Sequence, residues 1–125
     1  MNVIDSSFWI EFFKGNLKGT PLSELIKHNE LLYVPTIVIY EVFKKLMVDT
    51  TEEIASAAIV QMRKGIVVDL DSDLALNAAY ISREQKLPMA DSIIYATTLR
   101  YNATLWTQDK HFEGLSQVRY SPKSV

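Results

Sequence analysis

Residues 2–13 read NVIDSSFWIEFF. An apolar run at residues 2–4 ends at Asp5, and the two serines that follow are typical helix-capping residues in front of the aromatic run 8–13. The stretch therefore predicts a β-strand followed directly by an α-helix. Asp5 then lies at the carboxyl end of a strand, which is the side where α/β folds place their ligands.

The same order of strand and helix recurs along the rest of the chain. Helix starts are indicated by Pro21, by Thr36 and by Asp71, and Gly65 marks a helix end. The expected strands lie at residues 2–4, 31–34, 66–68, 103–106 and 118–120, and the expected helices at about residues 8–13, 21–28, 36–48, 52–62, 72–85 and 88–101.

Strands that alternate with helices favour right-handed crossovers and a mostly parallel sheet with helices on both faces. The strands also read as continuous apolar runs, as burial on both faces requires. We therefore predict an α/β fold, a three-layer α/β/α sandwich, formed by a single domain over residues 1–125. Only the tail at residues 121–125 is expected to be loose.

The composition excludes several classes of function. The chain has 125 residues, a formal net charge of -2 and no cysteine. This charge creates no global attraction to nucleic acid, so any RNA contact has to be local. The lack of cysteine excludes disulfides, thiolate zinc sites and a cysteine nucleophile. Because the sequence has neither an export signal nor a run of membrane-spanning length, we expect a soluble cytoplasmic protein without membrane contact.

Four acidic residues follow strand-like runs or lie near helix starts: Asp5, Glu41, Asp91 and Asp109. Asp5 and Asp109 end predicted strands, so they share the carboxyl edge of a parallel sheet. Glu41 lies within the apolar run IVIYEVF at residues 37–43, where a buried acid needs a partner or a metal. Asp91 lies in the first turn of the last long helix and can point into the cleft above the sheet.

Each acid also has a structural explanation when it is taken alone. Asp5 and Asp109 can serve as caps, and Asp91 is the kind of acid that a helix dipole favours in a first turn. Glu41 can form a surface ion pair with Lys45 at the i+4 position. The four positions taken together favour a cluster.

Carboxylates that are brought together repel one another, which raises their proton affinity unless a cation neutralises them. Mg²⁺ suits a site made of oxygen ligands, and Mn²⁺ can often substitute for it. A water molecule made more acidic by such an ion can attack a phosphodiester. Hydrolysis is then feasible without a catalytic histidine.

The motifs around the four acids resemble the PIN-domain ribonucleases, most closely the small VapC-like toxins of toxin-antitoxin pairs. They are VIDSS at residues 3–7, PTIVIYEV at residues 35–42, PMADSII at residues 88–94 and LWTQD at residues 105–109. Their order extends over essentially the whole chain. The resemblance implies metal-dependent endonucleolytic cleavage of RNA by a homodimer, which an antitoxin encoded alongside holds in check.

The resemblance also implies the site residues. The four acidic positions of the family correspond to Asp5, Glu41, Asp91 and Asp109, as catalytic residues and ligands of Mg²⁺ or Mn²⁺. Two hydroxyl residues, Ser6 and Thr107, correspond to supporting positions near the metal. One departure is His111, which stands before Phe112 where many relatives have an acid.

Four basic residues are candidates for contacts with RNA phosphates: Lys44, Lys45, Arg100 and Lys110. Lys110 is favoured because it directly follows Asp109. Scattered basic residues are also commonly just solvated charges, and this alternative stays open.

The aromatic helix after Asp5 has two interpretations. Trp9, Phe12 and Phe13 belong either to the core or to an apolar groove that binds the antitoxin. The surplus of apolar side chains on this helix and on the helix after Pro35 also favours a homodimer.

Other interpretations of the motifs are weaker. Residues 69–73, DLDSD, resemble the start of a calcium loop, but Leu74 and Tyr80 replace the turn glycine and the closing acid. His28 and His111 lack partners at zinc spacing, so partly exposed histidines are expected. A phosphoacceptor domain would need an acidic pair after the first strand, whereas this chain has one acid there. A non-catalytic PIN-fold module that binds RNA or protein remains the alternative to the nuclease.

Overall fold

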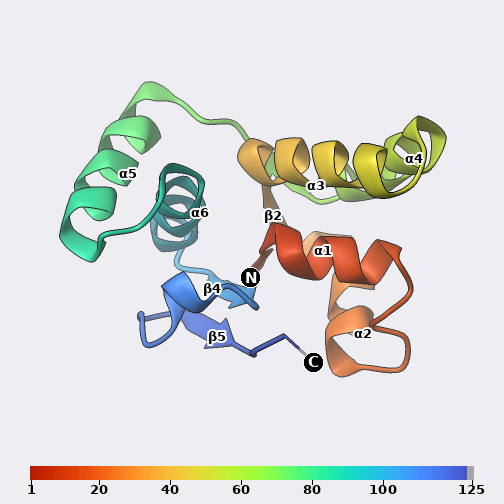
Figure 1. The fold of residues 1–125 in the computed structure, drawn as a ribbon. Coiled ribbons are helices and arrows are strands. Elements are labelled where there is room, and N and C mark those ends of the chain that lie inside the picture. Colours follow the sequence, from red (N-terminus) through yellow and green to blue (C-terminus); the bar gives the residue numbers. More distant parts are fainter. Residues whose placement is uncertain (124–125) are drawn as a thin grey trace.

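A five-stranded sheet forms the middle of the molecule, and the computed structural model describes residues 1–123. Its strands are β1 (Asn2–Ile4), β2 (Leu32–Pro35), β3 (Ile66–Val68), β4 (Thr104–Thr107) and β5 (Val118–Tyr120). Their order is β3-β2-β1-β4-β5, and every pair of neighbours runs parallel. The first strand is therefore central, between β2 and β4, and Figure 1 marks the N-terminus between the labels of these two strands.

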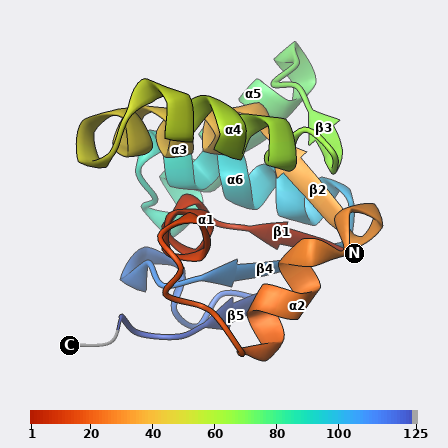
Figure 2. The ribbon, with the colours of Figure 1, turned by 90° about the vertical axis from the view of Figure 1, so that its right-hand side faces the viewer.

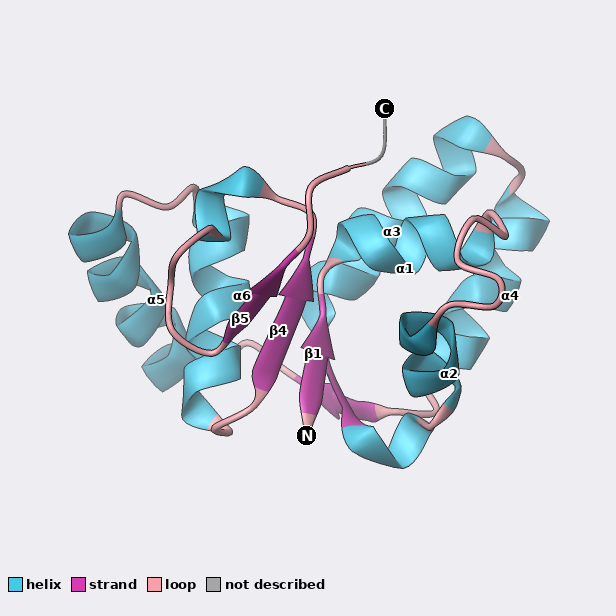
Figure 3. Cartoon of the chain, turned by 90° about the horizontal axis from the view of Figure 1, so that it is seen from below, coloured by secondary structure: helices cyan, strands magenta, loops and turns pink. Residues whose placement is uncertain are grey.

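Helices cover both faces of this sheet. They are α1 (Ser6–Phe13), α2 (Pro21–Lys27), α3 (Thr36–Asp49), α4 (Glu52–Met62), α5 (Ser72–Gln85) and α6 (Met89–Arg100), with short 3-10 turns η1 (Asn29–Leu31) and η2 (Lys110–Phe112). Figure 3 shows α5 and α6 on one side of the sheet and α1 to α4 on the other. Figure 2 shows α4 alongside α3, with which it packs closely. The predicted three-layer α/β/α sandwich is confirmed, and the predicted element ends differ from those observed by at most two residues.

Local sequence signals explain where the helices begin and end. The Thr51 hydroxyl accepts a hydrogen bond from the Ile54 amide at 3.2 Å, and Asp71 caps the Leu74 amide at 2.8 Å. Gly65 links α4 to β3 where space is short, because a Cβ there would lie 2.8 Å from the Val34 side chain. The DLDSD stretch is thus a strand end followed by a helix cap.

The hydrophobic core lies around the central strands, but the edge strand β3 is more exposed than the sequence predicts. Val3, Ile4 and Leu105 are fully or almost fully buried between the helical layers. In β3, by contrast, Ile66 and Val67 are exposed. The prediction of two-sided burial is wrong for this strand because β3 pairs on one side only and helices do not cover it fully.

The aromatic side chains of α1 pack mainly inward. Trp9 is only 1% exposed and stacks on Phe13, with ring centroids 5.7 Å apart. Phe12 and Phe13 are partly buried against the core. The structure corrects the partner-binding prediction for Trp9, because a buried indole presents no surface to a partner.

Residues 121–123 form no regular element, and residues 124 and 125 of the expected loose tail lie outside the described residues. Within residues 1–123, none of the helices has the length and apolar character that crossing a membrane requires.

Candidate metal centre

The four predicted acids come together at the carboxyl ends of the central strands. Asp5 follows β1 and caps α1, Glu41 lies on α3, Asp91 lies in the first turn of α6, and Asp109 follows β4 and caps η2. They line one pocket of about 300 Å³. The other residues that line it are Ser6, Ser7, Gln108, Lys110 and Lys123.

Asp5 is the most deeply buried of the four acids. It is 3% exposed, and its carboxylate accepts hydrogen bonds from the Ser6 amide at 2.8 Å and from the Thr107 hydroxyl at 2.7 Å. Burial raises the pKa of Asp5, and these hydrogen bonds oppose the rise. Asp5 therefore serves as a helix cap and as a member of the cluster at the same time.

Glu41 has a carboxylate oxygen that lacks a partner. Its Oε1 atom is buried and accepts no hydrogen bond within residues 1–123. The alternative ion pair with Lys45 is not formed, since the Lys45 Nζ lies 3.4 Å from Asp49 instead. Burial, and then the charge of Asp5, raises the pKa of Glu41. A buried and unpaired carboxylate oxygen calls for a proton or a cation.

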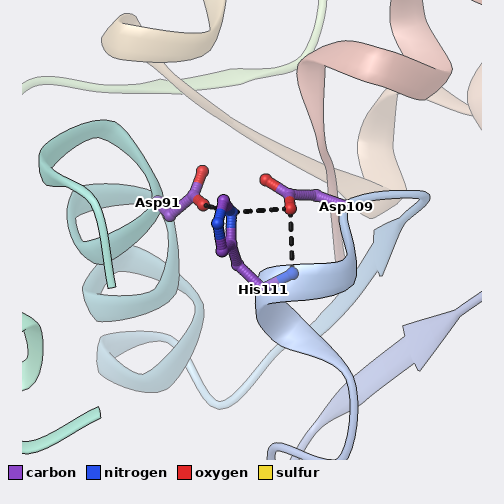
Figure 4. Close-up of side chains that lie close together, drawn as sticks. All are labelled: Asp91, Asp109 and His111. Atoms are coloured by element: carbon purple, nitrogen blue, oxygen red, sulfur yellow. Dashed lines mark hydrogen bonds and ion pairs between the residues drawn. The ribbon is translucent and has the colours of Figure 1, made fainter. Parts of the chain in front are cut away.

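Asp91 and Asp109 face each other across a histidine. The Nδ1 atom of His111 lies 3.0 Å from Asp91 Oδ2 and 2.9 Å from Asp109 Oδ1 (Figure 4). Asp91 is 8% exposed, and burial, followed by its interaction with Asp109, raises its pKa to about 7. Sequence reasoning missed His111 as a site residue. The one available signal was its place two residues after Asp109 in a short turn.

These residues fit a divalent cation. Three of them, Asp91, Asp109 and His111, each offer one ligand atom, and these atoms lie within 4.8 Å of one another. Glu41 Oε1 supplies a buried acceptor without a donor. The raised pKa values of Asp5, Glu41 and Asp91 show that burial opposes negative charge at this place. A cation would offset that penalty.

The predicted basic residues divide into those near the pocket and one far from it. Lys110 lines the pocket, and Lys44 and Lys45 line an adjoining hollow together with Glu41. Arg100 lies at the other end of α6 from the acids, and its guanidinium pairs with Asp71 at 2.8 and 3.1 Å. Arg100 does not line the acidic pocket, so its expected position near the cleft is wrong.

An apolar groove lies between α3 and α4. It has a volume of about 410 Å³ and is lined by Ile39, Tyr40, Phe43, Ser56, Ile59, Val60 and Arg63. Tyr40 also lines the hollow that contains Lys44, and Glu41 lines both that hollow and the acidic pocket. The groove, the hollow and the pocket therefore adjoin one another around residues 39–41 of α3.

The fold and the site define an α/β/α protein with a carboxylate-lined pocket at the carboxyl edge of a parallel sheet. The sequence profile of the PIN domain matches residues 3–117. The chain thus belongs to the PIN domain family, whose members are generally nucleases. No protein with a curated description matches the chain significantly.

Solved structures with the same fold include several toxin-antitoxin proteins. A toxin-antitoxin complex from Klebsiella pneumoniae matches with a TM-score of 0.79 and 20% identity over 100% of both chains. VapBC2 from Rickettsia felis, bound to a promoter DNA fragment, matches with a TM-score of 0.76 and 14% identity over 98% of each chain. VapC20 from Mycobacterium tuberculosis, a toxin that cleaves the sarcin-ricin loop, matches with a TM-score of 0.74 and 17% identity, over 95% of this chain and 99% of that one. At these identities the likeness establishes the shared fold.

Proposed function

We propose that the protein is a divalent-metal-dependent endoribonuclease and the toxin of a toxin-antitoxin pair, formed by one nuclease domain over residues 1–125. The observation that carries the proposal is the set of four carboxylates around one pocket, with a Glu41 oxygen buried and unpaired. Membership of the PIN domain family, together with the toxin-antitoxin structures that share the fold, supports the same function.

Asp5, Glu41, Asp91 and Asp109 would hold the ion, which we take to be Mg²⁺ or Mn²⁺. When bound, the ion would acidify a water molecule for attack on the phosphodiester and offset the charge that develops on the phosphate oxygens. The chain's own groups position this chemistry. The Thr107 hydroxyl and the Ser6 amide fix the Asp5 carboxylate. The other three acids line the same pocket at the carboxyl edge of the sheet.

RNA would reach the acids along a basic rim. Lys110 and Lys123 line the acidic pocket, and Lys44 lies in the adjoining hollow. Because the formal net charge of the chain is -2, these few cations would have to supply the local attraction to phosphates. A protein that cuts cellular RNA in this way would act in the cytoplasm.

The test compares cleavage of total cellular RNA by the wild type and by Asp5→Asn, with cleavage sites mapped in both. We expect cleavage with Mg²⁺ or Mn²⁺ that stops when the metal is chelated, and that Asp5→Asn abolishes. The control is Asp73→Asn, since Asp73 is an exposed first-turn acid of α5 outside the cluster. Cleavage by Asp5→Asn at the wild-type rate, after contaminating nuclease is excluded, would reject the proposed site. RNA binding without cleavage would favour the non-catalytic module.

The protein partners in this proposal are a second copy of the chain and an antitoxin. The outer face of α5 leaves Leu76 and Tyr80 exposed, and a homodimer would cover them. The groove between α3 and α4 would hold the antitoxin, because the hollow next to it also adjoins the acidic pocket. Light scattering of Leu76→Lys tests the dimer: we expect the mass to fall from that of a dimer to that of a monomer.

A further inference from the structure

We propose that His111 is a nitrogen ligand of the bound cation, and that it makes the site prefer a first-row transition-metal ion such as Mn²⁺ over Mg²⁺. The inference rests on the proposed metal site and deepens it. Two independent observations carry it: the position of the His111 ring between two acids, and the unpaired Glu41 oxygen in the same pocket.

The three ligand atoms have the spacing that a bound ion requires. His111 Nδ1 lies 3.0 Å from Asp91 Oδ2 and 2.9 Å from Asp109 Oδ1. Neighbouring ligands around an octahedral ion with bonds of about 2.1 Å are about 3 Å apart. The imidazole nitrogen is therefore spaced from both carboxylates as a neighbouring ligand would be (Figure 4).

One hydrogen bond at His111 Nδ1 accounts for only one of the two contacts. An imidazole Nδ1 atom carries at most one hydrogen, which can be directed well at one acceptor. Two carboxylate oxygens nonetheless approach His111 Nδ1 at nearly equal distances. A cation that receives electron pairs from all three atoms satisfies both carboxylates together.

The backbone around His111 holds the ring at this place. The His111 amide donates to Asp109 Oδ1 at 2.9 Å, and the next residue, Phe112, is fully buried in the core. The turn η2 is thus anchored from both sides. The imidazole itself is 58% exposed, so packing in the core does not explain its orientation.

A nitrogen ligand changes which ion the site prefers. Mg²⁺ favours oxygen ligands, whereas imidazole suits first-row transition metals. A pocket of carboxylates alone would serve Mg²⁺ well. With His111 added to Asp91 and Asp109, the same pocket should discriminate in favour of Mn²⁺.

The chain offers a direct test because it contains only two histidines. His28 lies outside the pocket at the end of α2, where it pairs with exposed Glu30 at 3.4 Å. In the His28→Gln variant, His111 is the sole histidine. Pulsed electron paramagnetic resonance of this variant loaded with Mn²⁺ should detect nitrogen coupling, which changes to the ¹⁵N pattern when the protein is labelled with [¹⁵N]histidine.

Binding measurements on the metal-free protein complete the test. We expect His111→Gln to weaken Mn²⁺ binding about tenfold and Mg²⁺ binding much less. His111→Asp, which offers oxygen in place of nitrogen, should shift the preference toward Mg²⁺. The matched control His28→Gln should bind both ions as the wild type does.

The proposal is wrong if Mn²⁺ binds at the acids without coupling to histidine nitrogen. It is also wrong if His111→Gln loses Mn²⁺ affinity and Mg²⁺ affinity equally. Asp91→Asn establishes that the ion binds at the acids, because it should weaken the binding of both ions. Histidine coupling without RNA cleavage by any divalent ion would reject the nuclease function and leave His111 as a ligand. A wild type that binds no divalent ion would overturn both proposals.

Discussion

The Thr107 hydroxyl donates a hydrogen bond to Asp5 Oδ2 at 2.7 Å, although 102 positions separate the two residues in sequence. The same hydroxyl oxygen accepts a hydrogen bond from the Asp109 amide at 2.9 Å. Strands β1 and β4 are neighbours, so this one side chain links two of the acidic residues directly. The role that the family resemblance implied for Thr107 thus has a geometric basis in the structure.

The first prediction concerns Thr107→Val, which keeps the shape of the side chain and removes the hydroxyl. Thr107 is fully buried, so a lost hydrogen bond to a charged partner should lower the free energy of unfolding by about 1–3 kcal/mol. Because Asp5 would also lose its orientation, divalent-ion affinity should fall about tenfold. Urea denaturation and calorimetry measure the two effects. Thr107→Ser keeps the hydroxyl and should retain most of the stability and most of the divalent-ion affinity. Equal losses in the two variants would contradict the role of the Thr107 hydroxyl in positioning Asp5.

The second prediction is a pH dependence of stability. The pKa of Asp91 is raised to about 7 in the folded protein, mainly by burial, whereas in the unfolded chain it is about 4. Folding therefore favours the protonated carboxyl, and its contribution to stability is lost as the pH rises through about 7. We expect the metal-free protein to be about 1–3 kcal/mol less stable at pH 8 than at pH 5.5 by urea denaturation.

Two variants check the assignment to Asp91. Asp91→Asn should reduce the loss of stability between pH 5.5 and pH 8 and stabilise the metal-free protein at pH 8, because it removes the charge and keeps the shape. Asp71→Asn is the control: Arg100 lowers the pKa of Asp71 to about 2, so that group loses its stabilising charge only when the pH falls well below 5.5. If the stability of Asp91→Asn changes with pH as steeply as that of the wild type, the pKa of Asp91 is not raised as proposed.

Much of the site could be predicted because strand ends in a parallel sheet share one edge. That rule placed Asp5 and Asp109 together, and the apolar neighbours of Glu41 indicated its burial. The contact between His111 and Asp91 could not be predicted from the sequence, because it depends on how the turn after β4 packs against the start of α6. Arg100 was misplaced because sequence gives no sign of which helix end faces the pocket.

The aromatic helix shows a second limit of sequence patterns. Apolar side chains surround most of α1, so the pattern does not distinguish a core helix from one that also binds a partner. The structure buries Trp9 and leaves an apolar groove between α3 and α4 instead. The exposure of Ile66 was missed for a related reason, because an apolar run does not reveal whether its strand lies at the sheet edge.

The third prediction concerns RNA binding. Lys110→Ala removes a cation from the acidic pocket, so the KM for RNA should rise and the salt dependence of binding should weaken by about 0.7 in logarithmic slope for each lost phosphate contact to a single strand. Metal affinity should change little. Fluorescence anisotropy with labelled RNA at several salt concentrations measures the slope. The control is Lys27→Ala on α2, where Lys27 pairs with exposed Glu24, and identical slopes for both variants would remove Lys110 from the RNA path.

The last prediction concerns the antitoxin and the groove between α3 and α4. Val60 lines this groove and Leu76 lies on α5 across the sheet, and both side chains are 62% exposed. Replacing either by lysine should therefore leave the fold intact. We expect Val60→Lys to lose co-purification with the product of the neighbouring gene and to cleave RNA in its presence, because a charge in the apolar groove would have to be buried by the partner. Leu76→Lys, which should break only the homodimer, should keep the partner bound. If both variants bind it as tightly as the wild type does, the antitoxin contacts another surface, and the continuity between the groove and the acidic pocket plays no part in inhibition.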